Sequence, residues 1–266
     1  MIPELAIQEW QEHAPWPGVE QVEQDLLICR ALVAIYSDPF LAANLAFRGG
    51  TALHKLFLNP QPRYSEDIDL VQVYAVPIKE TIMHLQKALA FMGNAYIKQK
   101  RHNNTLLYRL ESETEPRMPI RIKIEINCKE HFSVFPMITV PFKVENKWFS
   151  GECKILTYQL EELIGTKLRA LYQRRKGRDL FDLFKALSTG EINDDKILES
   201  YFKYMEFVVD HIPTYKEFCL NMEEKMQDDE FLGDTVGLLR KEASYNPQES
   251  YELVRARLLD RMKKND

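Results

Sequence analysis

The chain has 266 residues, of which 45% are hydrophobic and 28% are charged, a composition typical of a globular protein. Its formal net charge of −5 excludes a uniformly basic nucleic-acid binder, so contact with nucleic acid requires a local basic patch. The four cysteines lack CxxC pairing, which favours reduced thiols over a disulfide framework or a zinc site. No signal peptide opens the chain and no apolar run is long enough to span a bilayer, so we expect a cytoplasmic protein without membrane contact.

Helical and strand patterns alternate in the first part of the chain. Apolar residues at helical spacing predict three helices: residues 21–37, 51–58 and 78–91. The pair Asp38-Pro39 ends the first of them. Alternating or short apolar runs predict the following strands: residues 45–47, 68–73, 96–100, 105–110, 120–127 and, with a weaker pattern, 135–142.

The pattern becomes almost entirely helical from Gln159 onward. The predicted helices there are residues 159–173, 178–187, 194–209, 214–226 and 248–263. Strands mixed with helices, followed by a helical half, predict an α/β (α+β) domain and then a helical domain. We place the first domain at residues 1–150 and the second at residues 151–266.

An Asp-x-Asp motif begins the strand predicted at residues 68–73. Successive side chains of a strand point to opposite faces, so Asp67 and Asp69 share one face while Ile68 points into a core. Two neighbouring carboxylates repel unless a cation neutralises them, and magnesium prefers carboxylate and phosphate oxygens. Taken alone, the motif is more often an amphipathic strand with a solvated acidic edge.

The residues before this motif change its interpretation. Arg48-Gly49-Gly50-Thr51 lies between a predicted strand and a predicted helix. Glycines allow backbone N–H groups to approach a phosphate closely, and the start of a helix adds positive potential. A simple tight turn is the alternative. Because the Gly-Gly turn precedes an Asp-x-Asp motif, the combination predicts a site for a nucleoside triphosphate and its metal.

A third acidic residue lies on the strand predicted at residues 120–127. Its isoleucines face one way, and its polar residues, which include Lys123 and Glu125, face the other. If this strand lies beside the Asp-x-Asp strand, Glu125 is placed to activate an attacking hydroxyl. A half-exposed strand is the alternative when the pattern is considered alone.

The helical part carries a second group of charged residues. Lys167 lies within an apolar helical stripe, where it either snorkels to solvent or serves a function. Asp179 and Asp182 open the next predicted helix, where they favour the helix dipole and can pair with Arg174 or Arg178. Residues 167–178 contain six basic residues and no acid, which is either a solvated face or a footprint for triphosphate or RNA. Residues 255–264 are also basic but include Asp260.

These motifs together make the sequence resemble a known family. The run FRGGTALHKLFL…RYSEDIDLV resembles the AbiEii/AbiGii-type nucleotidyltransferases, the toxins of type IV toxin–antitoxin systems in the DNA polymerase β superfamily. The resemblance continues at Lys123-Ile124-Glu125, at GTKLRAL (residues 165–171) and at Arg174 with KGRDLFDL (residues 176–183). It therefore spans residues 47–183.

The resemblance implies a fold, an activity and a set of site residues. The expected fold is a polymerase β-like mixed sheet with flanking helices, followed by a helical domain. The expected activity is metal-dependent transfer of a nucleoside monophosphate from a nucleoside triphosphate to an RNA hydroxyl, plausibly the 3′ end of tRNA, by a toxin with a cognate antitoxin. Transfer to a small molecule or protein, and binding without turnover, are the alternatives.

The implied residues fall into three groups. Two magnesium ions are expected on Asp67, Asp69 and Glu125. The residues expected to take part in catalysis are Asp67, Asp69, Glu125, Lys167 and Asp179. The residues expected to hold the nucleoside triphosphate are Arg48, Gly49, Gly50, Thr51, Ser65, Lys167, Arg174, Arg178 and Asp182.

Overall fold

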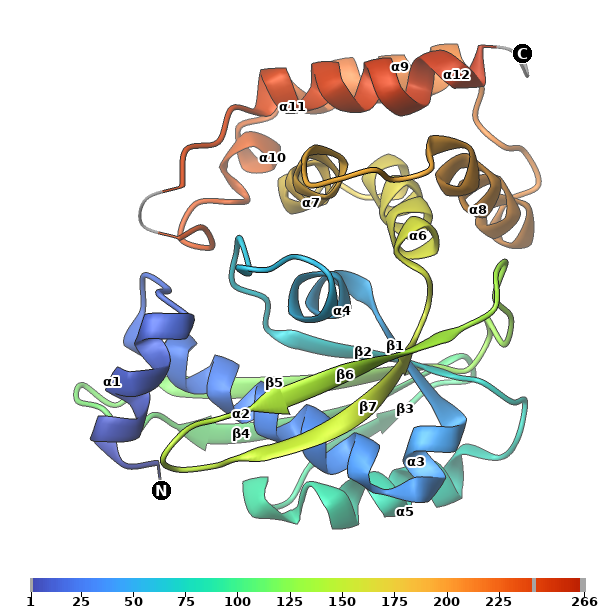
Figure 1. Cartoon of the computed structure of the whole chain (residues 1–266). Coiled ribbons are helices and arrows are strands. Elements are labelled where there is room, and N and C mark those ends of the chain that lie inside the picture. The colour runs from blue at the N-terminus through green and yellow to red at the C-terminus, as the bar shows by residue number, and fades with distance from the viewer. Residues whose placement is uncertain (1, 241–242, 264–266) are drawn as a thin grey trace. The chain divides into compact units, whose positions relative to one another are not determined.

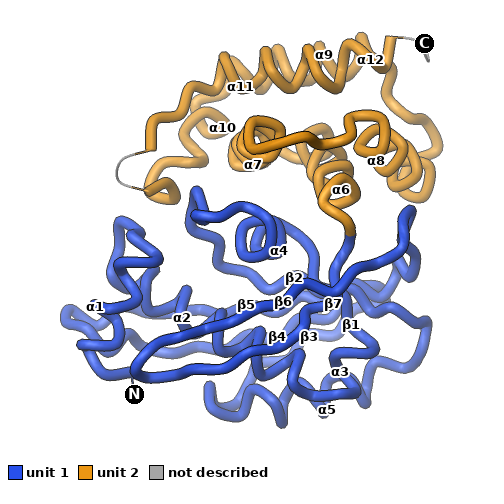
Figure 2. Tube along the Cα trace, viewed as in Figure 1, with its two compact units in different colours: residues 1–158 blue, residues 159–266 orange. Residues whose placement is uncertain are grey.

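The chain folds as two compact units that divide between Tyr158 and Gln159 (Figure 2). The computed structural model describes residues 2–240 and 243–263. The predicted boundary at residue 150 precedes the strand β7 (Gly151–Thr157), whereas the structure assigns that strand to the first unit. The difference arises because β7 pairs with strands of the first unit and so belongs to its sheet.

The first unit is built on a seven-stranded mixed sheet with the order β3-β4-β5-β2-β1-β7-β6. Its other strands are β1 (Leu45–Arg48), β2 (Asp67–Gln72), β3 (Tyr96–Gln99), β4 (Asn103–Glu111), β5 (Pro119–Asn127) and β6 (Ile138–Val144). β2 runs parallel to β5 and β1 runs parallel to β7, while the remaining neighbours are antiparallel. The predicted strands are therefore present. The strand with the weakest sequence pattern was expected at residues 135–142 and lies at Ile138–Val144.

Helices cover both faces of this sheet. They are α1 (Glu4–His13), α2 (Val19–Ser37), α3 (Pro39–Asn44), α4 (Gly49–Leu56) and α5 (Ile78–Ala88), with a short 3₁₀ turn at Ala90–Met92. In Figure 1, α4 lies on one face and α2, α3 and α5 lie on the other. Ile68, Ile122 and Ile124 are fully buried in the sheet. Their polar neighbours on β2 and β5 are partly buried or exposed, as alternation requires.

Asp38 explains why one predicted helix is followed by a second that the sequence analysis missed. The Asp38 carboxylate accepts hydrogen bonds from the backbone N–H groups of Phe40 at 2.9 Å and Leu41 at 3.1 Å. It therefore caps the start of α3, and Pro39 occupies the first turn, where a missing N–H costs nothing. The same dipeptide ends α2 and begins α3.

The second unit is helical and has its own core. Its helices are α6 (Leu160–Gln173), α7 (Gly177–Ser188), α8 (Asp194–Val208), α9 (Tyr215–Lys225), α10 (Asp229–Gly233) and α11 (Pro247–Val254), followed by a π-helical turn (Arg255–Leu259) and α12 (Asp260–Met262). Leu168, Tyr201 and Phe218 are among its fully buried residues. A side chain at Gly165 would lie 2.6 Å from the Cβ of Ser200, so this glycine lets α6 pack closely on α8.

The predicted helices of this unit are all present to within a few residues. The last of them, expected at residues 248–263, is interrupted by the π-helical turn, and Lys264 lies outside the described residues. None of the described helices is both long and apolar enough to cross a membrane.

Candidate active site

The sheet register brings the three acidic residues of the first unit together. Asp69 on β2 lies opposite Arg48 on β1 and opposite Glu125 on β5. Asp67 lies opposite Lys123. Because directly paired residues project to the same face, all five side chains belong to the face of the sheet that α4 covers (Figure 1).

Gly49 sits where no other residue fits. Its φ angle is +80°, a left-handed conformation that favours glycine. A Cβ atom there would lie 2.2 Å from Oδ2 of Asp69, so the Asp69 carboxylate fills the space that a side chain would need. Gly49 also begins α4, and Gly50 and Thr51 form its first turn, so the backbone N–H groups at this positive end of the helix lie next to the carboxylate.

Thr51 and Ser65 hold the start of β2 in place. Both are buried, and their hydroxyl oxygens lie 2.7 Å apart. The Thr51 hydroxyl donates to the carbonyl oxygen of Asp67. In this structure the two hydroxyls therefore fix the backbone of the Asp-x-Asp strand.

Lys123 links two of the carboxylates, a role that the sequence analysis missed. Its Nζ lies 2.9 Å from Asp67 Oδ2 and 3.0 Å from Glu125 Oε2. Burial disfavours the ammonium, but hydrogen bonds and attraction from both carboxylates outweigh it and raise the pKa of Lys123. Asn103 also donates to Glu125 Oε1 over 3.3 Å. The Lys-x-Glu spacing could have indicated this contact, since side chains two residues apart on a strand point to the same face.

Arg48 is anchored from the loop after β5. It forms an ion pair with the buried carboxylate of Glu130. Burial opposes the charge of Arg48, but the Glu130 carboxylate more than compensates and raises the pKa of the guanidinium. Asn127 shapes this loop, because its Oδ1 accepts the backbone N–H groups of Lys129 and Glu130, each at 2.9 Å. Sequence gave no signal for Glu130, which lies 82 residues from its partner.

The acidic side chains fit a hard cation by their chemistry and by their convergence. Asp67 and Glu125 direct oxygens at one ammonium nitrogen, so they are close enough to share a positive charge. Within residues 2–240 and 243–263, no group of three or more His, Cys, Asp or Glu side chains is already arranged to hold a metal. The Lys123 ammonium lies between two of these carboxylates, where a shared cation would neutralise the pair.

Lys167 lies in a buried ionic cluster of the helical unit. Its Nζ is 3.0 Å from Asp179 Oδ1 and 2.9 Å from Asp182 Oδ2, and both aspartate side chains are fully buried. Arg174 adds two bonds to Asp179, from Nε at 2.6 Å and from NH2 at 2.8 Å. The snorkelling alternative for Lys167 is therefore wrong, because its ammonium is bonded inside the unit rather than solvated.

The charge balance of this cluster sets the ionisation of Asp179. Burial penalises its carboxylate, but attraction from Lys167 and hydrogen bonding from Arg174 outweigh that penalty and lower the pKa of Asp179. Asp182 acts in the opposite direction as a neighbouring negative charge. Asp179 is therefore held ionised by two cations from α6 and the turn that follows it.

Acidic residues distant in sequence pair with Arg175, Lys176 and Arg178 of the basic run at residues 167–178. Arg178 Nε lies 3.0 Å from Asp234 Oδ2, and Lys176 Nζ lies 3.5 Å from Asp234 Oδ1. Arg175 approaches Asp228 at 3.3 Å and Glu224 at 3.6 Å. These three residues, like Lys167 and Arg174, are basic in sequence but paired with acids in space.

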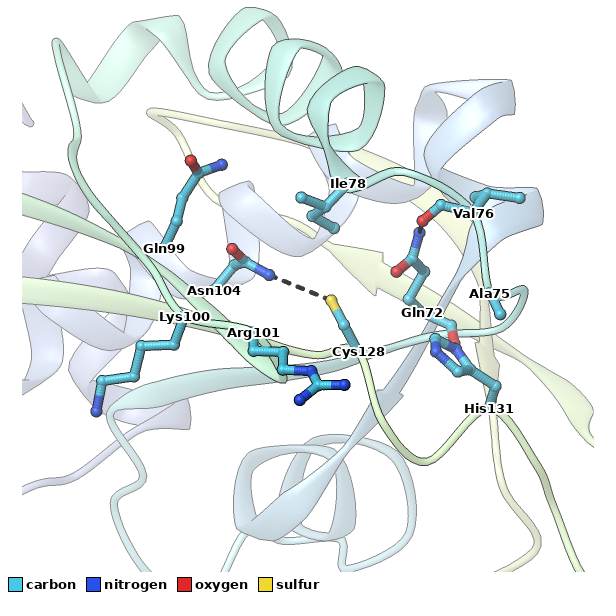
Figure 3. A pocket seen from close by; sticks show the side chains of 10 residues that line it. All are labelled: Gln72, Ala75, Val76, Ile78, Gln99, Lys100, Arg101, Asn104, Cys128 and His131. Carbon is cyan, nitrogen blue, oxygen red and sulfur yellow. Dashed lines mark hydrogen bonds between the residues drawn. The ribbon is translucent and has the colours of Figure 1, made fainter.

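A separate pocket of about 440 Å³ opens in the first unit (Figure 3). Its lining is Gln72, Ala75, Val76, Ile78, Gln99, Lys100, Arg101, Asn104, Cys128 and His131. Asn104 donates to Cys128 Sγ at 3.3 Å, and burial raises the pKa of that thiol. Gln72 and Asn104 alternate with Val71 and Asn103, so they belong to the face opposite Asp69 and Glu125. This pocket is therefore distinct from the acidic site.

Comparison with known structures supports the observed fold. The chain is similar to MenT4, a nucleotidyltransferase toxin from Mycobacterium tuberculosis, with a TM-score of 0.64, 16% identity, and coverage of 98% of this chain and 94% of that one. It is also similar to a protein from H. pylori assigned to the nucleotidyltransferases, with a TM-score of 0.55, 18% identity, and coverage of 92% and 95%. These likenesses confirm the predicted fold class, a mixed sheet with flanking helices followed by helices.

Sequence comparison then identifies the family. The search of curated proteins found no match to the chain. A family model described as nucleotidyl transferase AbiEii toxin, type IV toxin–antitoxin system, matches residues 30–251, which is well over half of the chain. The chain therefore belongs to the AbiEii nucleotidyltransferase toxin family of type IV toxin–antitoxin systems.

Proposed function

We propose that this nucleotidyltransferase moves a nucleoside monophosphate from a nucleoside triphosphate to a hydroxyl of RNA, with the 3′ end of tRNA as the acceptor. The observation that supports it best is the convergence of Asp67, Asp69 and Glu125 beside the Gly49 turn. Family membership implies the triphosphate substrate and an antitoxin partner. Unopposed transfer to tRNA in the cytoplasm would arrest growth, as suits a toxin.

The triphosphate is expected at the start of α4. The N–H groups of Gly49, Gly50 and Thr51 belong to the first turn, where backbone donors have no helical acceptor. Arg48 adds a cation at the same turn, held by Glu130. Thr51 and Ser65 support the site by fixing β2, because their hydroxyls are already bonded within the protein.

Asp67, Asp69 and Glu125 would hold two magnesium ions. When bound, magnesium would neutralise phosphate charge and stabilise the attacking and leaving oxygens. Lys123 competes for the same oxygens of Asp67 and Glu125, so it neutralises the pair when no metal is bound. The side chains of Lys123, Asp67 and Glu125 are about one-third exposed, so replacing the Lys123 ammonium with magnesium would cost little free energy.

Glu125 is the residue that we assign as the base. Its carboxylate accepts the proton of the RNA hydroxyl, the hydroxyl oxygen bonds to the α-phosphorus, and the bond to the leaving pyrophosphate breaks. In the helical unit, Arg174 is the exposed member of the ionic cluster and is assigned to the triphosphate. Arg174 is positioned by the cluster of Lys167, Asp179 and Asp182, which also contributes fixed charge. Arg178 orients the start of α7 through Asp234.

The test is incubation with each labelled nucleoside triphosphate and total RNA, with and without magnesium. Label in a discrete RNA band that requires magnesium supports the proposal, and digestion from the 3′ end then locates it. Asp69→Asn is the matched control, because it keeps the side-chain shape and removes the charge. Label in protein or in small molecules would instead indicate another acceptor, and label nowhere would overturn the transfer reaction itself.

A further inference from the structure

We propose that the free edge of the sheet binds the single-stranded RNA segment that leads to the acceptor hydroxyl. The surface consists of Tyr96 and Lys98 on β3, Arg109 on β4 and Arg121 on β5, and we call it the edge platform. The proposal rests on the proposed function, since it assigns the RNA a path to Glu125. It names a binding surface that belongs to the first unit and shares no residue with the basic run of the helical unit.

The strand register places the edge platform on the same face as the acidic site. Lys98 pairs with Thr105, and Thr105 pairs with Glu125, so the three side chains form one row. Tyr96 begins a second row that crosses Leu107 to Lys123. Neighbouring strands are about 4.8 Å apart, so Lys98 lies roughly 10 Å from Glu125, two strand spacings away. β3 is an edge strand of the sheet, and β4 is its neighbour.

The charge of the edge platform is uncompensated. The segment from Gly93 to Leu110 contains four lysines and arginines and no acid. Among residues 2–240 and 243–263, the side chains of Lys98, Arg109 and Arg121 have no ion-pair partner. Arg109 and Arg121 also lie directly opposite each other on adjacent strands, an arrangement that is destabilising for like charges. A bound polyanion would relieve that repulsion.

Two groups of basic residues in the helical unit, at residues 174–178 and 255–263, differ in this respect. Those at residues 174–178 are paired with acids. In the C-terminal segment, Arg257 and Arg261 pair with Asp194, and Lys263 pairs with Asp260 at 2.7 Å. Phosphates that bind there would compete with carboxylates already paired to these cations, whereas the edge platform presents its cations directly.

The exposed ring of Tyr96 favours single-stranded RNA over a duplex. Its side chain is 65% exposed, although an aromatic ring gains most from being covered. Proteins bind single-stranded RNA by stacking unpaired bases on aromatic rings beside a cationic track. A duplex hides its base faces and offers nothing for Tyr96 to stack on. One exposed ring within a group of unpaired cations therefore fits an unpaired 3′ terminus.

The first test compares two double charge reversals that change the net charge equally. The Lys98→Glu/Arg109→Glu variant alters the edge platform, and Lys79→Glu/Lys87→Glu alters exposed lysines of α5 on the other side of the sheet. Binding of a 5′-labelled single-stranded RNA oligonucleotide is measured by fluorescence anisotropy at several salt concentrations. The platform variant should bind about tenfold more weakly or worse, with a salt slope lower by about 0.7 for each lost phosphate contact. The control should bind like the wild type.

Single substitutions separate an RNA contact from a structural effect. Arg109→Glu converts a like-charge pair with Arg121 into an opposite-charge pair, so its melting temperature should hold or rise while RNA binding weakens. Tyr96→Ala should weaken binding about tenfold at every salt concentration, because stacking does not release counterions. Equal RNA affinity in the wild type, the platform double variant and Tyr96→Ala would overturn the proposal, as would failure of the wild type to bind the oligonucleotide.

The outcomes also distinguish this proposal from the proposed function. If the wild type labels RNA but the platform variants bind and label it equally well, the edge platform is refuted and the transfer reaction stands. If the wild type labels only protein or small molecules, the RNA acceptor is refuted. Retained binding of nucleoside triphosphate by the platform variants, measured as a thermal shift, shows that any loss concerns the acceptor.

Discussion

Replacing Lys167 with methionine tests how the helical unit is held together. Methionine preserves the apolar stem of the lysine and removes its ammonium, which lies 2.9 Å from Asp182 and 3.0 Å from Asp179. Removing one member of a buried ion pair typically costs about 3–5 kcal/mol, because it leaves a buried charge uncompensated. Asp179 keeps its two bonds from Arg174, so most of the loss should arise at Asp182. We therefore expect a loss of about 3–5 kcal/mol in the free energy of unfolding.

The measurement is urea unfolding at neutral pH, followed by far-ultraviolet circular dichroism. Lys203→Met is the matched control, since Lys203 pairs with Glu206 at the surface and such pairs contribute at most about 1 kcal/mol. The double variant Lys167→Met/Asp182→Leu should recover much of the loss, because apolar replacement of a whole buried pair is nearly neutral. A Lys167→Met protein as stable as the control would refute the argument, since the ammonium would then be solvated.

Three further predictions follow from the geometry. Asp67→Ala should abolish nucleotide transfer in the labelling assay. It should change the free energy of unfolding by no more than about 1 kcal/mol, because the ion pair of Asp67 with Lys123 is about one-third exposed. A larger loss of stability with activity retained would make the residue structural. Gly49→Ala should lower the free energy of unfolding by more than about 1 kcal/mol and also reduce activity, because a φ of +80° strains a residue with a side chain and the new Cβ would meet Asp69. Thermal unfolding at the wild-type temperature would contradict this. Asp179 has a folded-state pKa below its ordinary value of 3.8, so its contribution to stability is present above that pH and is lost as the pH falls through the folded-state pKa. The melting temperature of Asp179→Asn should therefore fall less steeply in acid than that of the wild type.

The sequence predicted best what depends on local periodicity. The alternation in residues 120–127 predicted β5 with the correct inward and outward residues, and helical spacing predicted α6 through α9. Several elements were missed, among them α1, α10, β7 and α3. The strand β7 carries a weak pattern because Gly151 and Cys153, at alternate positions in its first half, are only partly buried. The helix α3 is only six residues long and is defined by its cap at Asp38 rather than by periodicity.

The site could be predicted where its residues are close in sequence. Gly49 and Asp69 were named from motifs, but their contact depends on a φ angle and on the register of β1 with β2. Ion pairs between distant segments gave no local signal. Asp234 follows Arg178 by 56 residues, so a run that is basic in sequence could not be recognised as neutralised. Lys123 was visible on the polar face of β5, yet its position between two carboxylates follows only from the pairing of β5 with β2.

The two ionic groups differ in how a substrate's charge can act on them. In the helical unit, Lys167 and its aspartates are buried, so separating them would leave charges without water and cost several kcal/mol. In the first unit, Lys123, Asp67 and Glu125 are each about one-third exposed, so water can solvate any group that is released. A cation entering the first site therefore opposes only a weak interaction, while the buried cluster keeps its geometry throughout. This contrast favours exchange of cations at the carboxylates of the sheet and a fixed structural role for Lys167, Asp179 and Asp182, in whose cluster Arg174 is the exposed member.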